Sequence, residues 1–482
     1  MHANAWVAAA TKYCNTSTLY FLHRHNPPLN MSDGTLRKAD KDYSKILDEQ
    51  LPEIEAQAAS NVQSSLERLL SLEKQTRQAS DAPSVTRLLL CIARTLHAHA
   101  PWETLIDNIL LLTKKHGQLK ASITALVQES MKYITGSAPY NDKDMKMIDT
   151  LLGVTEGKIF VEVERARLTL MKSKHSEANG DIEKAASVLL DLQVESFGSM
   201  PPREKLEFIL EQVRLCLARG DYDLAAITAR KISTKQLETT ETTDLRLRYY
   251  ELVIRIGLHN DAYLDIAKHY RSVSLTDALP AQHVLETLQS AIMFLILAPW
   301  DTESSSLLAS VLDTTDIERR APLYAELGRC FLRGEVMRWP LIEQAYGPTL
   351  RETAVFGAAP DGKGDARWDV LRERVTEHNI RTLAKYYTRL SLPRLSTLLD
   401  LPPAAALDAL SRTVTSASSP VYARVDRPAG IVTFEKKKGG NEVLNEWSAN
   451  VKSLLSTIGR VGELIGKEEA LASVRKAKAA NA

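Results

Sequence analysis

The chain has 482 residues, too many for one ordinary hydrophobic core, so we expect two or more domains. Its hydrophobic content of 44% and charged content of 25% are ordinary for a globular protein. Lys and Arg number 61 against 60 Asp and Glu, and this net charge of +1 argues against a chain built to coat a phosphate backbone.

Cysteine usage and hydropathy exclude two further classes. The four cysteines (Cys14, Cys91, Cys216 and Cys330) are far apart and form no CxxC, which argues against a disulfide scaffold or a metal knuckle and fits a reducing compartment. The longest strongly apolar run, residues 291–300, is far short of the roughly 20 residues that span a bilayer. It therefore predicts a buried core helix, and we expect no membrane association.

The first residues, 1–31, differ from the rest of the chain. No Asp or Glu precedes Asp33, whereas Lys12 and Arg24 give a basic lean. A targeting peptide has such a composition, but arginine is scarce here. We expect residues 1–31 to be an N-terminal extension that is either disordered or a start-site artefact, with the true start at Met31.

Helical spacing runs almost unbroken from residue 38 to residue 339. Apolar residues three and four apart, such as Leu66, Leu69 and Leu70, form one face of a helix. No run before residue 420 alternates convincingly with period two. The sequence therefore predicts a helical-repeat arm over residues 32–260.

A repeat of 40 residues marks the middle of this arm. Asp181, Asp221 and Asp261 each separate two amphipathic stretches. Gly or Asn before each Asp predicts a left-handed turn that ends one helix, and the Asp is expected to cap the next. Small residues early in each second helix (Ala185, Ala186, Ala225 and Ala226) would let the partner helix approach closely. Such helical hairpins stack into a TPR-like solenoid because one hairpin cannot bury its apolar face alone.

Residues 357–365, GAAPDGKGD, read as a surface loop. Gly357, Gly362 and Lys363 begin like a phosphate-binding P-loop, but Gly364 replaces the required Ser or Thr and Asp365 would repel phosphate. We expect no nucleotide site.

Residues 374–435 predict a winged helix. Three helices are expected over 374–390, 392–401 and 403–414, followed by a strand pair at 421–427 and 430–434. The third helix has almost none of the Arg, Lys, Asn or Gln side chains that read base edges. Nucleic-acid binding stays an alternative, supported only by Lys436, Lys437 and Lys438.

The strand pair offers a second use, because the outer edge of a sheet can be extended by a strand of another protein. The residues that we expect at this wing edge are Val421, Tyr422, Val425, Ile431, Val432 and Phe434.

Residues 437–482 predict one long amphipathic helix with Asn441 as its N-cap. Its apolar positions are spaced 3, 4, 3, 4, 3, 4, the pattern that packs helices knobs into holes. They are Leu444, Trp447, Val451, Leu454, Ile458, Val461 and Ile465. We expect this seam to join partner helices, the alternative being a helix folded back on its own domain. Gly459, Gly462 and Gly466 indicate either a close helix approach or a frayed end.

The sequence offers no convincing pattern for catalysis or metal binding. His97 and His99 lie on opposite sides of a predicted helix, and neither they nor His23 and His25 have the downstream Ser and Asp of a deubiquitinase zinc site. The pairs Arg338-Trp339 and Arg367-Trp368 fit either partner contacts or buried anchors. We expect neither an enzyme nor a cofactor.

Several segments together resemble the PCI-domain proteins of the proteasome lid, the signalosome and translation initiation factor three. The resemblance runs from about Met31 to the C-terminal helix. It is carried by SLEKQTRQASD (71–81), VTEGKIFVEVERARLT (154–169), LQVESFGSM (192–200), EFILEQVRLCLA (207–218), EHNIRTLAKYYTRL (377–390), VDRPAGIVTF (425–434) and LNEWSANVKSLL (444–455).

The resemblance implies a PCI domain at residues 261–436 and a non-catalytic scaffold of the lid, in the cytoplasm and the nucleus. In that family, winged helices pack side by side into a horseshoe and C-terminal helices form a bundle. The implied partners are other PCI and MPN subunits in a hetero-oligomer, with base ATPases or the core particle reached through the N-terminal arm. A signalosome subunit is the alternative within the family.

Overall fold

The computed structural model describes residues 43–58, 61–134, 138–237, 242–276, 279–357, 362–416, 421–435 and 439–480. The predicted extension at residues 1–31 and the three lysines at 436–438 lie outside these ranges. The described residues form helices and one small three-stranded sheet, which confirms the expected mainly α class. No described helix is long and apolar enough to cross a membrane.

The chain divides into two compact units, Met1–Ala291 and Ile292–Ala482. The predicted arm lies in the first unit and the predicted winged helix in the second, while the predicted PCI domain at 261–436 spans the division. Each unit is described by itself below.

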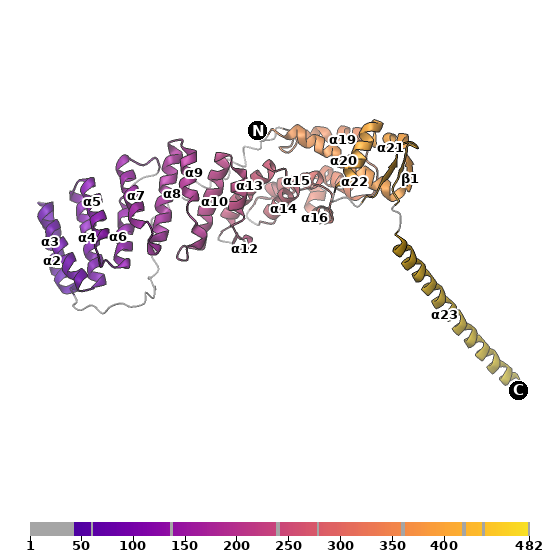
Figure 1. Ribbon diagram of the computed structural model, residues 1–482, viewed down its shortest axis with the longest axis horizontal. Helices are drawn as coiled ribbons and strands as arrows, with labels where there is room; N and C mark the ends of the chain where they lie inside the picture. Colours follow the sequence, from indigo (N-terminus) through magenta and orange to yellow (C-terminus); the bar gives the residue numbers. More distant parts are fainter. Residues whose placement is uncertain are drawn as a thin grey trace. The chain divides into compact units, whose positions relative to one another are not determined.

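The first unit is a stack of helices that follow one another in chain order (Figure 1). Its helices are α2 (Ser44–Ala58), α3 (Val62–Gln78), α4 (Ala82–His99), α5 (Trp102–Lys114), α6 (Lys120–Lys132), α7 (Asp142–Thr155), η1 (Ile159–Val161), α8 (Glu162–Ala178), α9 (Ile182–Leu190), η2 (Val194–Ser196), α10 (Pro202–Arg219), α11 (Tyr222–Ala229), α12 (Thr234–Leu237), α13 (Thr243–His259) and α14 (Tyr263–Ser274). Helix α15 (Ala281–Leu297) contains the boundary between the units.

The predicted hairpins are α8–α9, α10–α11 and α13–α14, and the turns of the first two are built as the repeat suggested. Gly180 and Gly220 have φ of +87° and +88°, a left-handed conformation that a side chain would strain. The amides of Asp181 and Asp221 reach back to the carbonyls of Ser176 at 2.9 Å and Cys216 at 3.0 Å. These bonds satisfy carbonyl groups at the end of each first helix.

The expected capping role of the aspartates is wrong. Asp181 and Asp221 occupy N-cap positions, but neither side chain accepts a capping hydrogen bond. Asp181 instead pairs with Lys184 at 2.8 Å and Asp221 with Arg219, so ion pairing competes for the carboxylates. Asp261 takes the left-handed position itself, with φ of +54°, and Ala262 precedes the next helix.

Small residues bring the paired helices together, as predicted, although one of the four is only half-buried. Ala185, Ala186 and Ala225 are fully buried, Ala226 is half-buried, and the Ser173 hydroxyl of α8 donates to the Ala185 carbonyl at 2.9 Å. The apolar run that predicted a core helix is buried from Ala291 to Ala298. Hydrophobic burial therefore drives the stacking that one hairpin could not achieve.

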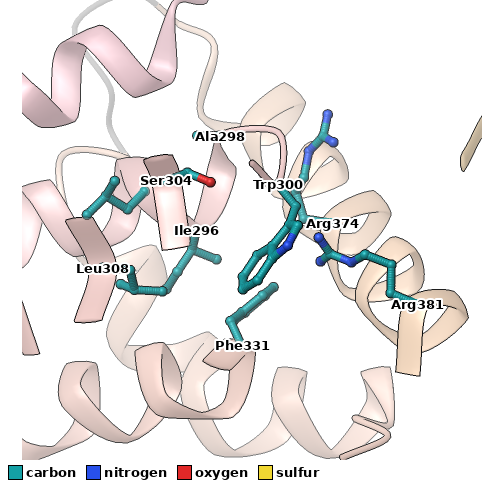
Figure 2. Close-up of a pocket in the computed structure, with 9 residues that line it drawn as sticks. Ile296, Ala298, Trp300, Ser304, Leu308, Phe331, Arg374 and Arg381 are labelled. Atoms are coloured by element: carbon teal, nitrogen blue, oxygen red, sulfur yellow. The ribbon is translucent and has the colours of Figure 1, made fainter. Parts of the chain in front are cut away.

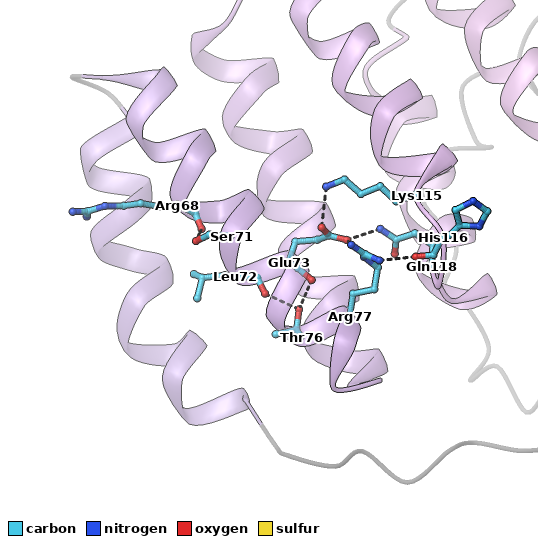
Figure 3. Close-up of polar contacts among 9 residues, drawn as sticks. All are labelled: Arg68, Ser71, Leu72, Glu73, Thr76, Arg77, Lys115, His116 and Gln118. Carbon is cyan, nitrogen blue, oxygen red and sulfur yellow. Dashed lines mark hydrogen bonds and ion pairs between the residues drawn. The ribbon is translucent and has the colours of Figure 1, made fainter.

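A buried ionic cluster fastens α3 to the connection between α5 and α6 (Figure 3). The Glu73 carboxylate is fully buried and accepts hydrogen bonds from Arg77 and Lys115, each at 3.0 Å, and from Gln118 at 2.6 Å. Arg77 also donates to the His116 carbonyl at 2.5 Å. Two cations and an amide thus replace the water that this carboxylate loses.

The second unit continues with α16 (Thr302–Leu312), α17 (Thr315–Arg320), α18 (Pro322–Leu332) and α19 (Trp339–Arg351). The winged-helix module follows as α20 (Gly364–Tyr386), β1 (Arg389–Ser391), α21 (Leu392–Leu399), α22 (Pro403–Thr415), β2 (Arg424–Asp426) and β3 (Ile431–Thr433). The last helix is α23 (Gly440–Ala480).

Two predicted boundaries of the module are corrected. Helix α20 begins at Gly364, ten residues before the expected start at residue 374, because residues 364–365 belong to its first turn rather than to a loop. It ends at Tyr386, and residues 389–391 form a strand instead of the predicted helix end. Tyr387 is extended, and pairing with β3 supplies the backbone hydrogen bonds that the helix would have made.

One apolar core holds the module together. Leu395 and Leu399 of α21, Ala406 and Leu410 of α22, and Ile380 of α20 are buried in a single cluster with the inner face of the sheet. Both Trp-containing pairs named above lie outside this cluster: Trp368 is buried and meets Trp339 edge to face, with 5.6 Å between ring centroids. Trp368 is therefore a packing anchor.

Candidate functional site

Helix α23 carries an uncovered apolar seam. Every residue from 440 to 476 is exposed, including all seven predicted seam positions. Trp447 is 67% exposed, and the others are Leu444, Val451, Leu454, Ile458, Val461 and Ile465. Protein surfaces rarely leave so continuous an apolar stripe in water unless it meets a partner. In the described part of the chain the seam is therefore exposed, and its contact with partner helices stays a prediction.

The start of α23 differs from the prediction. The helix begins at Gly440, so Asn441 lies inside it and is not the N-cap. Glu442 reaches back instead and accepts a hydrogen bond from the Gly439 amide at 3.1 Å. The helix runs without a break through Gly459, Gly462 and Gly466, and open space surrounds each of these glycines.

The sheet has the order β1-β3-β2, with both pairs antiparallel. Strand β3 lies in the centre, so its backbone does not form the open edge that the predicted strand pair implied. The missed strand β1 is the cause, because it occupies the side of β3 that would otherwise be free. The open edges belong to β1 and β2.

The register shows which backbone groups face outward on β2. Phe434 donates to the Thr388 carbonyl at 2.9 Å, and Leu392 donates to the Gly430 carbonyl at 2.8 Å, across the β1–β3 pair. Successive residues of a strand point their backbone groups to opposite sides, so residues 431 and 433 face β2. Their partners are Asp426 and Arg424, and the backbone N–H and C=O of Val425 between them point toward the open edge.

The six predicted wing-edge residues fall into two groups. Val421, Val432 and Phe434 are buried in the module core, so their side chains hold the sheet on the helices. Tyr422, Val425 and Ile431 are exposed. On β3 the alternation of side chains along the strand places Ile431 outward and Val432 inward, whereas all of β2 is exposed. The prediction assigns no inner face to the strand pair.

The third helix of the module, α22, offers little to nucleic acid. Its basic residue, Arg412, pairs with Glu373 at 2.6 Å. The rest of the helix carries none of the Lys, Asn or Gln side chains that read base edges.

The described residues contain no cluster of three or more His, Cys, Asp or Glu in reach of one metal ion. His97 stacks on Tyr133 with 4.1 Å between ring centroids and meets Trp102 edge to face. Its neighbour His99 is exposed. His23 and His25 lie outside the described residues.

Three family models match in succession. They are described as PSMD12/CSN4, N-terminal, over residues 64–282, as PCI domain over residues 333–436, and as 26S proteasome regulatory subunit RPN5 C-terminal domain over residues 441–473. The last match covers the exposed seam of α23.

Curated relatives match over most of the chain. The 26S proteasome regulatory subunit rpn501 of Schizosaccharomyces pombe is 41% identical over 445 residues, which are 92% of this chain and 99% of the relative. The 26S proteasome non-ATPase regulatory subunit 12 of Dictyostelium discoideum is 36% identical over 91% of this chain and 97% of its own. The COP9 signalosome complex subunit 4 of Emericella nidulans is 24% identical over 64% of this chain and 74% of its own.

Proposed function

The chain belongs to the family of 26S proteasome regulatory subunits that includes RPN5 and non-ATPase regulatory subunit 12, and on that premise we propose that it is a non-catalytic scaffold of the regulatory-particle lid. It serves ubiquitin-dependent protein degradation by holding other subunits in place. The observation that carries this proposal is the exposed seam of α23, because a scaffold needs surfaces that stay uncovered until partners arrive.

We assign two docking devices to this scaffold. The seam of α23 joins a bundle of C-terminal helices, and the open edges of the module sheet pair with neighbouring PCI subunits. MPN subunits are further partners, and the N-terminal arm reaches base ATPases or the core particle. The complex works in the cytoplasm and the nucleus.

A truncated chain that ends before Asn441 tests the helical-bundle role. We expect the rest of both compact units to stay folded, because the residues of α23 are exposed from 440 to 476, while the chain fails to enter the lid on a native gel. Normal incorporation of the truncated chain would overturn the proposal. Full-length chain must also co-purify with proteasomal ATPases, since co-purification with a deneddylase would identify a signalosome subunit instead.

A further inference from the structure

A small pocket in the second unit combines an indole, two guanidinium groups and an apolar floor (Figure 2). Trp300 follows the end of α15, while Arg374 and Arg381 project from α20, two turns apart on one face. Ile296, Leu308 and Phe331 form the floor. The pocket volume is about 10 Å³, roughly the space of one water molecule.

The pocket holds more positive than negative charge. The Arg381 guanidinium lies 4.2 Å from the centroid of the Trp300 ring, and no carboxylate among the described residues pairs with it. Arg374 donates to Glu377 at 2.5 Å, so the nearest acid on α20 is already engaged. Arg374 also has a buried Nε that finds no acceptor in the described part of the chain.

The cost of this arrangement is visible in Arg381. Burial lowers the pKa of its guanidinium to about 10; attraction by Glu377 raises this pKa, and like-charge repulsion from Arg374 lowers it. The group stays charged at neutral pH, and the one carboxylate that attracts it is hydrogen-bonded to Arg374, so the fold keeps a partly desolvated cation without an ion pair of its own. An anion supplied from outside would relieve the repulsion and accept the unused hydrogen bonds.

We propose that this pocket accepts an acidic side chain of a neighbouring protein subunit, with its carboxylate between Arg374 and Arg381 at the edge of Trp300. This inference rests on the proposed scaffold function. A carboxylate is planar and can accept hydrogen bonds from guanidinium groups, and Trp and Arg are enriched among the residues that contribute most to binding at protein interfaces.

The first test measures how fast labelled full-length chain leaves a lid reassembled from its subunits. Arg381→Met keeps the long apolar stem and removes the charge, and we expect dissociation at least about tenfold faster. Arg381→Lys should recover part of the loss because it keeps the charge but not the planar fork. Arg372→Met is the matched control, since Arg372 is exposed on the opposite side of α20.

The free chain supplies the second readout. Because no partner acid is present there, Arg381→Met should change its thermal midpoint by no more than about 3 °C, the loss of one cation–π contact. A purely structural Arg381 would instead lower stability and binding together, which would overturn the proposal.

Photo-crosslinking identifies the occupant without altering Arg381. Exposed Pro299, next to Trp300, is replaced by p-benzoylphenylalanine in the full chain within the lid. We expect a crosslink to a partner segment that contains Asp or Glu, and its loss with Arg381→Met. A segment without an acid, or a crosslink unchanged by Arg381→Met, refutes the pocket proposal; failure of the wild-type chain to enter the lid refutes the scaffold function instead.

Discussion

Asn379 pairs with the backbone of Met337 in both directions, accepting from its amide at 2.8 Å and donating to its carbonyl at 2.6 Å. The Asn379 side chain, on α20, thereby makes the two backbone hydrogen bonds that a neighbouring strand would make with the segment between α18 and α19. His378 extends the same clamp by bonding the Glu335 carbonyl at 3.0 Å through Nε2. Both side chains are buried, so this segment depends on α20 for its conformation.

The His378 clamp predicts a loss of local stability in acid. Burial lowers the pKa of His378 to about 4, while an unfolded His titrates near pH 6.5. The unfolded state therefore binds more protons between these values, and stability falls as the pH drops through this window. We expect a loss of about 2 kcal/mol between pH 8 and pH 5 from this group.

Hydrogen exchange of α20 amides in the full chain measures this loss. His378→Gln keeps a donor for the Glu335 carbonyl but cannot titrate, so the difference between wild type and variant isolates His378 from other groups. An equal acid dependence in both proteins would contradict the prediction.

Loss of the buried carboxylate in Glu73→Ala should destabilise the first unit by about 3 kcal/mol, because Arg77 and Lys115 would stay partly buried without their counter-ion. Denaturant unfolding of the full chain, followed by hydrogen exchange of α3, measures the change. Asp48→Ala is the control. It removes the exposed pair between Arg87 and Asp48, at 2.6 Å, and should cost less than about 1 kcal/mol. Equal effects would show that burial does not govern these pairs.

Two charges placed on the seam of α23 should block assembly and leave the free chain intact. Leu454→Glu with Ile458→Glu puts carboxylates where knobs would enter holes, and their burial would cost several kcal/mol. Lys452→Glu lies on the opposite side of α23 and should assemble normally. Native gels that detect incorporation into the lid distinguish the double variant from Lys452→Glu. Normal assembly of the double variant would exclude the seam as the contact.

A proline on β2 tests edge pairing. Val425→Pro removes an N–H that points toward the open edge, and the ladder between β2 and β3 keeps its hydrogen bonds. Val425→Thr has a similar shape and keeps the N–H, so it serves as the control. We expect weaker binding of a neighbouring PCI subunit, by about tenfold, only for the proline variant. Binding lost equally in both variants would point to the Val425 side chain instead.

The sequence predicted what local signals determine. Gly180 and Gly220 indicated left-handed turns because glycine takes positive φ without strain. The spacing of Leu454 and Ile458 indicated the seam. Strand β1 was not predicted, because three residues are too short to show a period-two pattern. The strand pairs with β3, which lies far along the chain and gives no local signal.

The pocket at Trp300 also escaped prediction. Arg374 and Arg381 are seven residues apart, which placed them on one face of a helix, but nothing local indicated that Trp300 would lie against them. Likewise, Asp181 occupies the N-cap position that the sequence indicates, but its carboxylate pairs with the nearby Lys184 ammonium and makes no capping hydrogen bond. Contacts between distant segments, and competition among nearby charges, remain invisible to pattern reasoning.

The exposed seam of α23 also bears on how much of this chain a cell retains. A chain made in excess of its partners displays a long apolar stripe to the chaperones and proteases that act on exposed hydrophobic surface. The lifetime of the free chain should then depend on how many partner subunits are available to bind it. The same stripe that binds partner helices would thus expose any copy that lacks partners to degradation. Surplus copies would be removed, and subunit stoichiometry would be kept without a separate sensor.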